Sequence, residues 1–169
     1  QSFGTDSLLT NTTGEDNTAL GKSGLQSNTT GDKNTAGGNY ALKSNTTADN
    51  NTAFGYYSLY ANTTGTENTV VGANALDANT TASYNTAVGN NALGTNILGS
   101  RNTALGRDAL FAMNPASAVD MYNTAVGFGA GAAVTTGTQN TLIGGLAGDA
   151  ITTSSNNTAV GYLALSANT

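Results

Sequence analysis

The sequence predicts an all-β fold, a β-solenoid (β-roll or β-prism) in which each coil of the chain is one 17-residue unit. Three observations carry this prediction. An Asn-Thr pair returns every 17 residues with one exception, a glycine stands at a fixed place in each repeat, and each unit holds short runs with β-branched residues. Such a unit is too short for a helical hairpin repeat, which needs about 30 residues or more.

The Asn-Thr pair sets the register of the repeat. With its asparagine as position one, the unit reads N-T-A-[VL]-G-x-x-A-L-x-[SA]-N-T-T-G-x-x. The spacing is 17 throughout, except for one step of 21 between Asn102 and Asn123. Position five is glycine in all ten units: Gly4, Gly21, Gly38, Gly55, Gly72, Gly89, Gly106, Gly127, Gly144 and Gly161.

The whole chain, residues 1–169, is therefore one array of ten units. The first and last units are incomplete, because Gln1 falls at position two and Thr169 at position thirteen. Neither end resembles a capping repeat, so we expect the array to belong to a longer one. The unit 102–122 carries a four-residue insertion with the only proline, Pro115. We expect a surface loop there, either merely tolerated or functional.

Each unit is expected to supply two short strands and two tight turns. β-Branched residues favour strands at positions two to four, as in 86–88, and at positions twelve to fourteen, as in 79–81. The glycine at position five and the T-G-x-x segment favour turns. Ten coils stacked about 4.8 Å apart would make a rod on the order of 50 Å long.

The core is expected at positions four and nine, which hold most of the large apolar residues. The predicted core residues are Val88, Leu93, Val126, Leu42, Leu59, Leu76 and Leu110. Where glycine replaces leucine at position nine, Val134 or Ile151 appears three positions later, as a packed interior requires. Two large side chains per coil bury little area for a whole ordered unit. We therefore expect three chains to share the core as a homotrimer, which could also join end to end.

Composition excludes several kinds of site. The chain has no His and no Cys, so thiolate or imidazole metal sites and Ser-His-Asp triads cannot form. Its carboxylates fall mostly in turns, and we expect no enzyme activity, no cofactor and no metal. Five basic residues in a chain of net charge −5 argue against nucleic acid as a partner. No apolar run is long enough to insert into a membrane.

Aromatic residues gather in the unit that begins at Asn51. Tyr56, Tyr57 and Tyr60 are candidates for contact with a cell-surface glycan, because a tyrosine ring offers both a face and a hydroxyl. The alternative is that these rings only cover a turn, with Phe54 as the core residue of position four.

The N-T-A-V-G-x-x-A-L-x-S-N-T-T-G repeat resembles the arrays of tail-fibre-domain proteins of bacteriophages and bacterial surfaces. More loosely, Ala87-Val88-Gly89 and Ala125-Val126-Gly127 resemble the head repeats of trimeric autotransporter adhesins. The resemblance implies a trimeric extracellular fibre, on a virion or as a bacterial surface appendage, that displays an attachment region. The 17-residue unit is longer than the usual adhesin-head unit.

An ice-binding solenoid is the alternative function. Threonine recurs at position two in almost every unit and again at position thirteen, and a regular threonine ladder on a flat face could order water as ice does. The ladder at position thirteen breaks at Ile97, which argues against this alternative because an ice-binding face must be regular.

Overall fold

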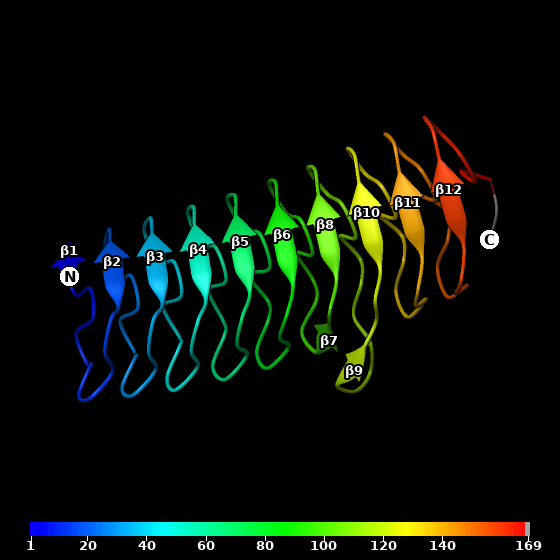
Figure 1. Ribbon diagram of the computed structural model, residues 1–169. Coiled ribbons are helices and arrows are strands. Elements are labelled where there is room, and N and C mark those ends of the chain that lie inside the picture. Colours follow the sequence, from blue (N-terminus) through cyan, green and yellow to red (C-terminus); the bar gives the residue numbers. More distant parts are fainter. Residues whose placement is uncertain (168–169) are drawn as a thin grey trace.

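The chain is a β-solenoid, as the repeat predicts. The computed structural model describes residues 1–167, which wind into stacked coils, one for each repeat unit, with strands and turns and no helix. Figure 1 shows the strands of one wall side by side, in chain order from one end of the stack to the other. It follows that no helix within this part of the chain could cross a membrane.

Ten strands form one parallel sheet along this wall. Nine of these strands cover positions two to four of their units and β1 covers positions three and four, and equivalent positions pair between coils, as Thr69 pairs with Thr86. The strands of this sheet are β1 (Ser2–Phe3), β2 (Thr18–Leu20), β3 (Thr35–Gly37), β4 (Thr52–Phe54), β5 (Thr69–Val71), β6 (Thr86–Val88), β8 (Thr103–Leu105), β10 (Thr124–Val126), β11 (Thr141–Ile143) and β12 (Thr158–Val160).

No strand forms at positions twelve to fourteen of the described coils, so the prediction of a second strand there was wrong. Positions twelve to fourteen form a bend instead, because the asparagine at position twelve hydrogen-bonds within its own coil. The Nδ2 of Asn62, for example, donates to the carbonyl oxygen of Gly65 at 2.9 Å. Such side-chain bonds to nearby backbone favour turns over extended chain.

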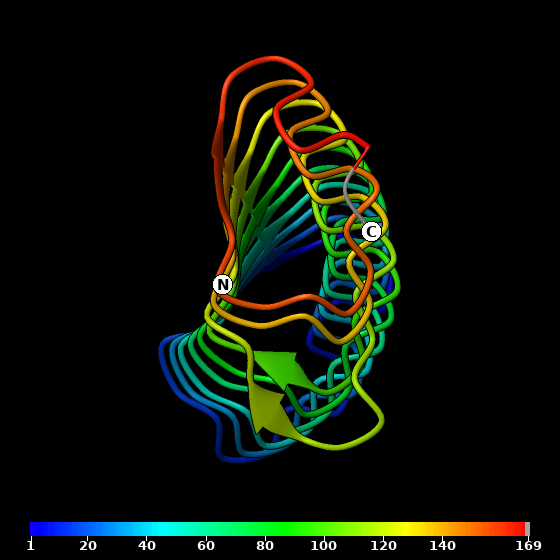
Figure 2. The same cartoon turned by 90° about the vertical axis from the view of Figure 1, so that its right-hand side faces the viewer.

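The four extra residues of the insertion leave the main sheet undisturbed. β8 and β10 pair in register across the longer step, and the added segment forms β9 (Val119–Asp120), which pairs with β7 (Gly99–Ser100). Figure 2 shows these two short strands at the edge of the stack, away from the main sheet. The guanidinium of Arg101 holds the segment through an ion pair with Asp120, with Nε 2.9 Å from Oδ2. The loop is thus fixed to the preceding coil.

A hydrophobic core lies inside the coils of the single chain. The leucines at position nine, Leu42, Leu59, Leu76, Leu93 and Leu110, are fully buried. They share the interior with the small residues of positions three and eight, mostly alanine. Each coil is narrow because only alanine separates its walls, so one leucine per coil fills the space.

The prediction that position four belongs to the core was wrong. Val88 and Val126 are only half-buried and lie on the outer face of the sheet. Successive strand residues point to opposite faces, so position four shares a face with the threonine of position two. The interior position of the strand is position three, where Ala87 and Ala125 are fully buried.

Two ladders of buried asparagines complete the interior. At position one, the Oδ1 of each asparagine accepts a bond from the backbone N–H of the next, at 2.9–3.2 Å from Asn17 to Asn157. At position twelve, each Nδ2 donates to the preceding Oδ1 at 2.7–2.9 Å from Asn11 to Asn79. These bonds satisfy polar groups that burial would otherwise leave without partners.

The ladder of position twelve ends at Asn79. Asn96 donates from Nδ2 to the carbonyl oxygen of Gly99 at 2.8 Å, as its counterparts do, but its Oδ1 accepts from the backbone N–H of Gly99 at 2.9 Å. It makes no bond to Asn79, whose Oδ1 is buried without a partner. In the following coils Met113, Val134 and Ile151 occupy position twelve and are fully buried. The interior therefore changes from polar to apolar along this column.

A substitution that restores the repeat pattern is expected to destabilise the chain. A Cβ at Gly131 would lie 2.7 Å from Leu142 Cδ1 and 3.0 Å from Leu110 Cδ2. Leu142 stands at position three, where most coils have alanine, so it already fills the space of the missing leucine. We expect Gly131→Leu to lower the free energy of unfolding by about 1–3 kcal/mol through overpacking.

Urea denaturation of Gly131→Leu, of Leu142→Ala and of the double variant measures this coupling. The double variant should recover most of the loss, because Leu142→Ala removes the side chain that the new leucine meets. Additive losses in the double variant would contradict the exchange of volume between the two positions.

Candidate functional surfaces

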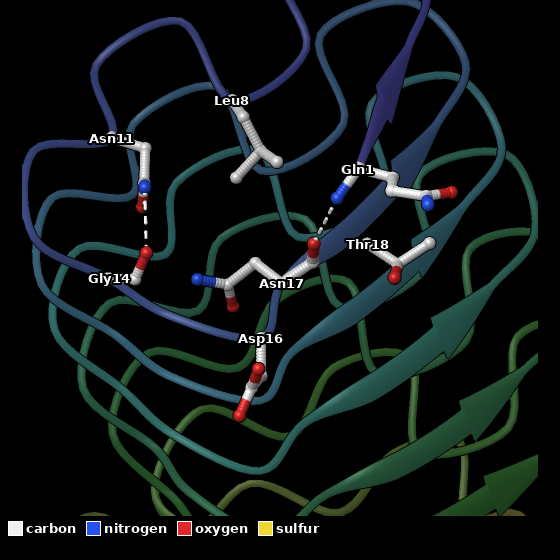
Figure 3. Close-up of a pocket in the computed structure, with 7 residues that line it drawn as sticks. All are labelled: Gln1, Leu8, Asn11, Gly14, Asp16, Asn17 and Thr18. Carbon is white, nitrogen blue, oxygen red and sulfur yellow. Dashed lines mark hydrogen bonds between the residues drawn. The ribbon is translucent and has the colours of Figure 1, made fainter.

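In the part of the chain that the structure describes, the two main surface pockets lie at the two ends of the stack of coils. Figure 3 shows the one at the first coil, which is the coil interior seen from its open side. Its lining includes Asn11 and Asn17, the first members of the two asparagine ladders. Among residues 1–167, no three acidic side chains lie close enough together to hold a metal ion. The features with functional potential are therefore surfaces on the walls.

The outer face of the ten-stranded sheet, here called the flat face, consists of the side chains at positions two and four. Position four carries an apolar column in which Leu20, Phe54, Val71 and Ile143 are 39–43% exposed. No charged residue occupies either position in any unit. This apolar strip, interrupted at Gly37, makes the flat face a candidate interaction surface.

The two predicted threonine ladders have different roles. At position thirteen, the threonine hydroxyls donate to the carbonyl oxygen of the next coil at 2.9–3.1 Å from Thr12 to Thr80, and these bonds link the coils. At position two, nine threonines from Thr18 to Thr158 form an unbroken column on the flat face. Within the described coils their hydroxyls make no hydrogen bond to the protein.

Four tyrosines, Tyr40, Tyr56, Tyr57 and Tyr60, form a second surface, here called the tyrosine cluster. The ring centroids of Tyr57 lie 4.5 Å from Tyr56, 4.6 Å from Tyr60 and 5.0 Å from Tyr40. The structure thus brings the three predicted tyrosines together and adds Tyr40. Tyr40 belongs to the preceding coil, and it stands one full repeat before Tyr57, which is the signal that could have found it.

Two lysines flank the tyrosine cluster, and the sequence alone did not connect them with it. The Nζ of Lys43 lies 5.5 Å from the ring centroid of Tyr40 and 5.6 Å from that of Tyr60. The Nζ of Lys22 lies 5.8 Å from Tyr40. The pKa of Tyr57 is raised above its ordinary value, chiefly by loss of solvent around the phenol and then by the neighbouring tyrosines.

The backbone holds two of these tyrosines in an unfavourable conformation. Position seven is left-handed in each coil, with φ of 64° at Tyr40 and 57° at Tyr57. The next two coils place Asn74 and Asn91 there, and asparagine tolerates this region much better than bulky residues do. A tyrosine in this conformation costs roughly 1 kcal/mol more conformational free energy than an asparagine does.

The fold and its surfaces define this chain as a parallel β-solenoid with one flat, uncharged face and an aromatic cluster. No model of a known protein family matches the chain, and no curated protein or solved structure does either.

Proposed function

We propose that this chain is a segment of an extracellular fibre, a rigid shaft in which three copies associate through their flat faces. The apolar column at position four is the observation that carries this proposal. It runs along the sheet with one gap at Gly37, its side chains are exposed or half-exposed, and no other part of residues 1–167 covers it. Because each chain encloses its own core, the contact between copies lies on this outer face.

The flat face is small for a contact between two copies alone. Ten strands about 4.8 Å apart, nine of them three residues long, give a face of roughly 400 Å². Two such faces would bury roughly 800 Å² together, below the roughly 1,200 Å² at which stable interfaces begin. We propose three copies because the repeat resembles those of trimeric fibre proteins, and three faces that meet on one axis would bury roughly 1,200 Å² over the whole assembly. The proposed fibre holds an attachment region on a virion or a bacterial surface, as the resemblance of the repeat implies.

Light scattering at two protein concentrations tests the association. We expect a mass three times 16.8 kDa that does not change on dilution. Val71→Lys and Val126→Lys should each give monomers, because they place charges in the contact. Thr47→Lys is the matched control, since Thr47 is exposed at position fourteen, away from the sheet, and this variant should stay trimeric. A monomeric unmodified chain would refute the proposal.

Ice binding is a second candidate, favoured by the unbroken threonine column at position two. Its free hydroxyls and methyl groups stand beside the apolar column on a rigid sheet, an arrangement that could order water. Thermal hysteresis of the purified chain tests this function. A monomer with hysteresis that Thr69→Lys abolishes and Thr47→Lys retains would favour ice binding. A trimer without hysteresis would favour the fibre, because the same face cannot serve both contacts.

A further inference from the structure

We propose that the tyrosine cluster, with Lys22 and Lys43, is a binding site for a glycan that carries a carboxylate, such as a sialic or uronic acid. The site deepens the proposed fibre function, on which its biological purpose rests, by placing an attachment site on the shaft itself. The inference depends on three features of the site: the rings, the charges and the wall on which they lie.

The rings form a platform that is open to solvent. Tyr56 is 54% exposed, and the other three tyrosines are partly exposed. Tyr57 lies between its neighbours and is stacked on Tyr60 with an angle of 28° between the ring planes. Apart from one another, the hydroxyls of these four residues have no hydrogen-bond partner within the described coils. The cluster therefore offers ring faces for the apolar side of a sugar and hydroxyls for its polar groups.

The charges at the cluster select an acidic sugar. Lys22 and Lys43 are two of only five basic residues in a chain of net charge −5. Neither lysine makes an ion pair in the part of the chain that the structure describes. Asp77, one coil beyond Tyr60 in the same column, is half-buried, and burial raises the pKa of its carboxyl group. A carboxylate on the ligand would supply the opposite charge that the two ammonium groups lack.

The cluster lies on a wall that stays free in the proposed fibre. Positions six to eleven form the wall opposite the sheet, as Figure 2 shows. The two walls pack across the interior, because a Cβ at Gly24 of position eight would lie 3.6 Å from Ala19 Cβ of the sheet. Association through the flat face would therefore leave Tyr56, Tyr57 and Tyr60 exposed.

Tyrosine fluorescence reports binding directly, because the chain has seven tyrosines and no tryptophan. Titration with sialyllactose and with trigalacturonate tests the two sources of a sugar carboxylate, and lactose is the neutral probe. We expect a saturable change with at least one acidic sugar and at least fivefold weaker binding of lactose. Equal binding of lactose, or no saturable change with either acidic sugar, would overturn the proposal.

Variants separate the rings from the charges. Tyr57→Asn should lower the affinity for the acidic sugar at least tenfold. The fold should be retained, because the next two coils carry asparagine at this position. Lys43→Gln should lower the affinity for the acidic sugar about fivefold and leave the affinity for lactose unchanged. Tyr162→Asn is the control, since Tyr162 shares position six with Tyr56 but lies far along the stack. If Tyr57→Asn binds as the unmodified chain does, the site is elsewhere.

The outcomes for the fibre and for the glycan site are independent. A monomer that binds the acidic sugar through Tyr57 would refute the proposed fibre function and support the proposed glycan site. A stable trimer whose fluorescence shows no saturable change with either acidic sugar would refute the proposed glycan site and support the proposed fibre function.

Discussion

Asn51→Asp is expected to lower the free energy of unfolding by about 3–5 kcal/mol at neutral pH, although it exchanges only an NH₂ group for an oxygen. Asn51 is fully buried. Its Nδ2 donates to the carbonyl oxygen of Gly65 at 2.8 Å, and its Oδ1 accepts from the backbone N–H of Asn68 at 3.0 Å. The aspartate would place an oxygen against the Gly65 carbonyl and bury a charge without a cation nearby.

The effect of Asn51→Asp should depend on pH with a definite sign. Burial without an opposite charge raises the pKa of the new carboxyl group in the folded state above its ordinary value of about 3.9. The unfolded chain therefore ionises more readily, and the loss of stability is complete above the folded-state pKa. It should shrink as the pH falls toward the unfolded-state pKa, because both states then hold the proton.

Urea denaturation at several pH values between neutral and acidic checks this prediction against a neighbouring control. Asn50→Asp changes the adjacent residue in the same way, but Asn50 is exposed at position seventeen, where the first coil already carries Asp16. Its effect should stay within about 0.5 kcal/mol. Equal losses in the two variants would show that the ladder of position one does not determine stability.

The coil and its period could be predicted from the sequence because they depend on backbone geometry. A left-handed or extended glycine is needed at the same place in each coil, and a parallel stack aligns identical positions. The 17-residue register and the glycine of position five therefore define a β-solenoid without any knowledge of packing. The insertion after Asn102 could also be placed outside the sheet, since the strand pattern resumes at Thr124.

The side of the sheet that faces the interior could not be predicted from residue size alone. Large apolar residues at position four and alanine at position three suggested that position four was buried, whereas the structure buries alanine. The period of two in a strand was the better guide, because it forces positions two and four onto one face. The interior is narrow, and the leucine of position nine fills it from the opposite wall.

Some of the aromatic residues have a packing role, and the sequence could have predicted it, because each of them follows a glycine of the preceding coil by one repeat. A Cβ at Gly37 would lie 2.2 Å from the ring of Phe54, and one at Gly94 would lie 3.1 Å from Phe111. Each ring thus covers the glycine that stands one repeat before it. Tyr57 differs, because the residue one coil before it is Tyr40. An aromatic ring that follows a glycine by one repeat therefore fills the space over that glycine. A ring that follows another aromatic residue by one repeat belongs to a cluster.

Gly72→Ala is expected to lower the free energy of unfolding by about 3–5 kcal/mol, a large effect for one added methyl group. Gly72 has a φ of 142°, which L-residues with a side chain rarely adopt. A Cβ there would lie 2.5 Å from the carbonyl oxygen of Gly89 in the next coil. That oxygen belongs to the backbone, so relief of the clash must move a whole coil, and overpacking adds to the strain.

Gly65→Ala is the matched control, because it also places a Cβ against backbone, 2.2 Å from the carbonyl oxygen of Ala82. Gly65 stands at position fifteen and lies outside the left-handed region, and Ala48 and Ala82 occupy this position in other coils. The backbone there can therefore adjust, and we expect a loss below about 1 kcal/mol in urea denaturation. If both variants lose the same stability, crowding and not the dihedral angle would explain why position five is glycine in all ten units.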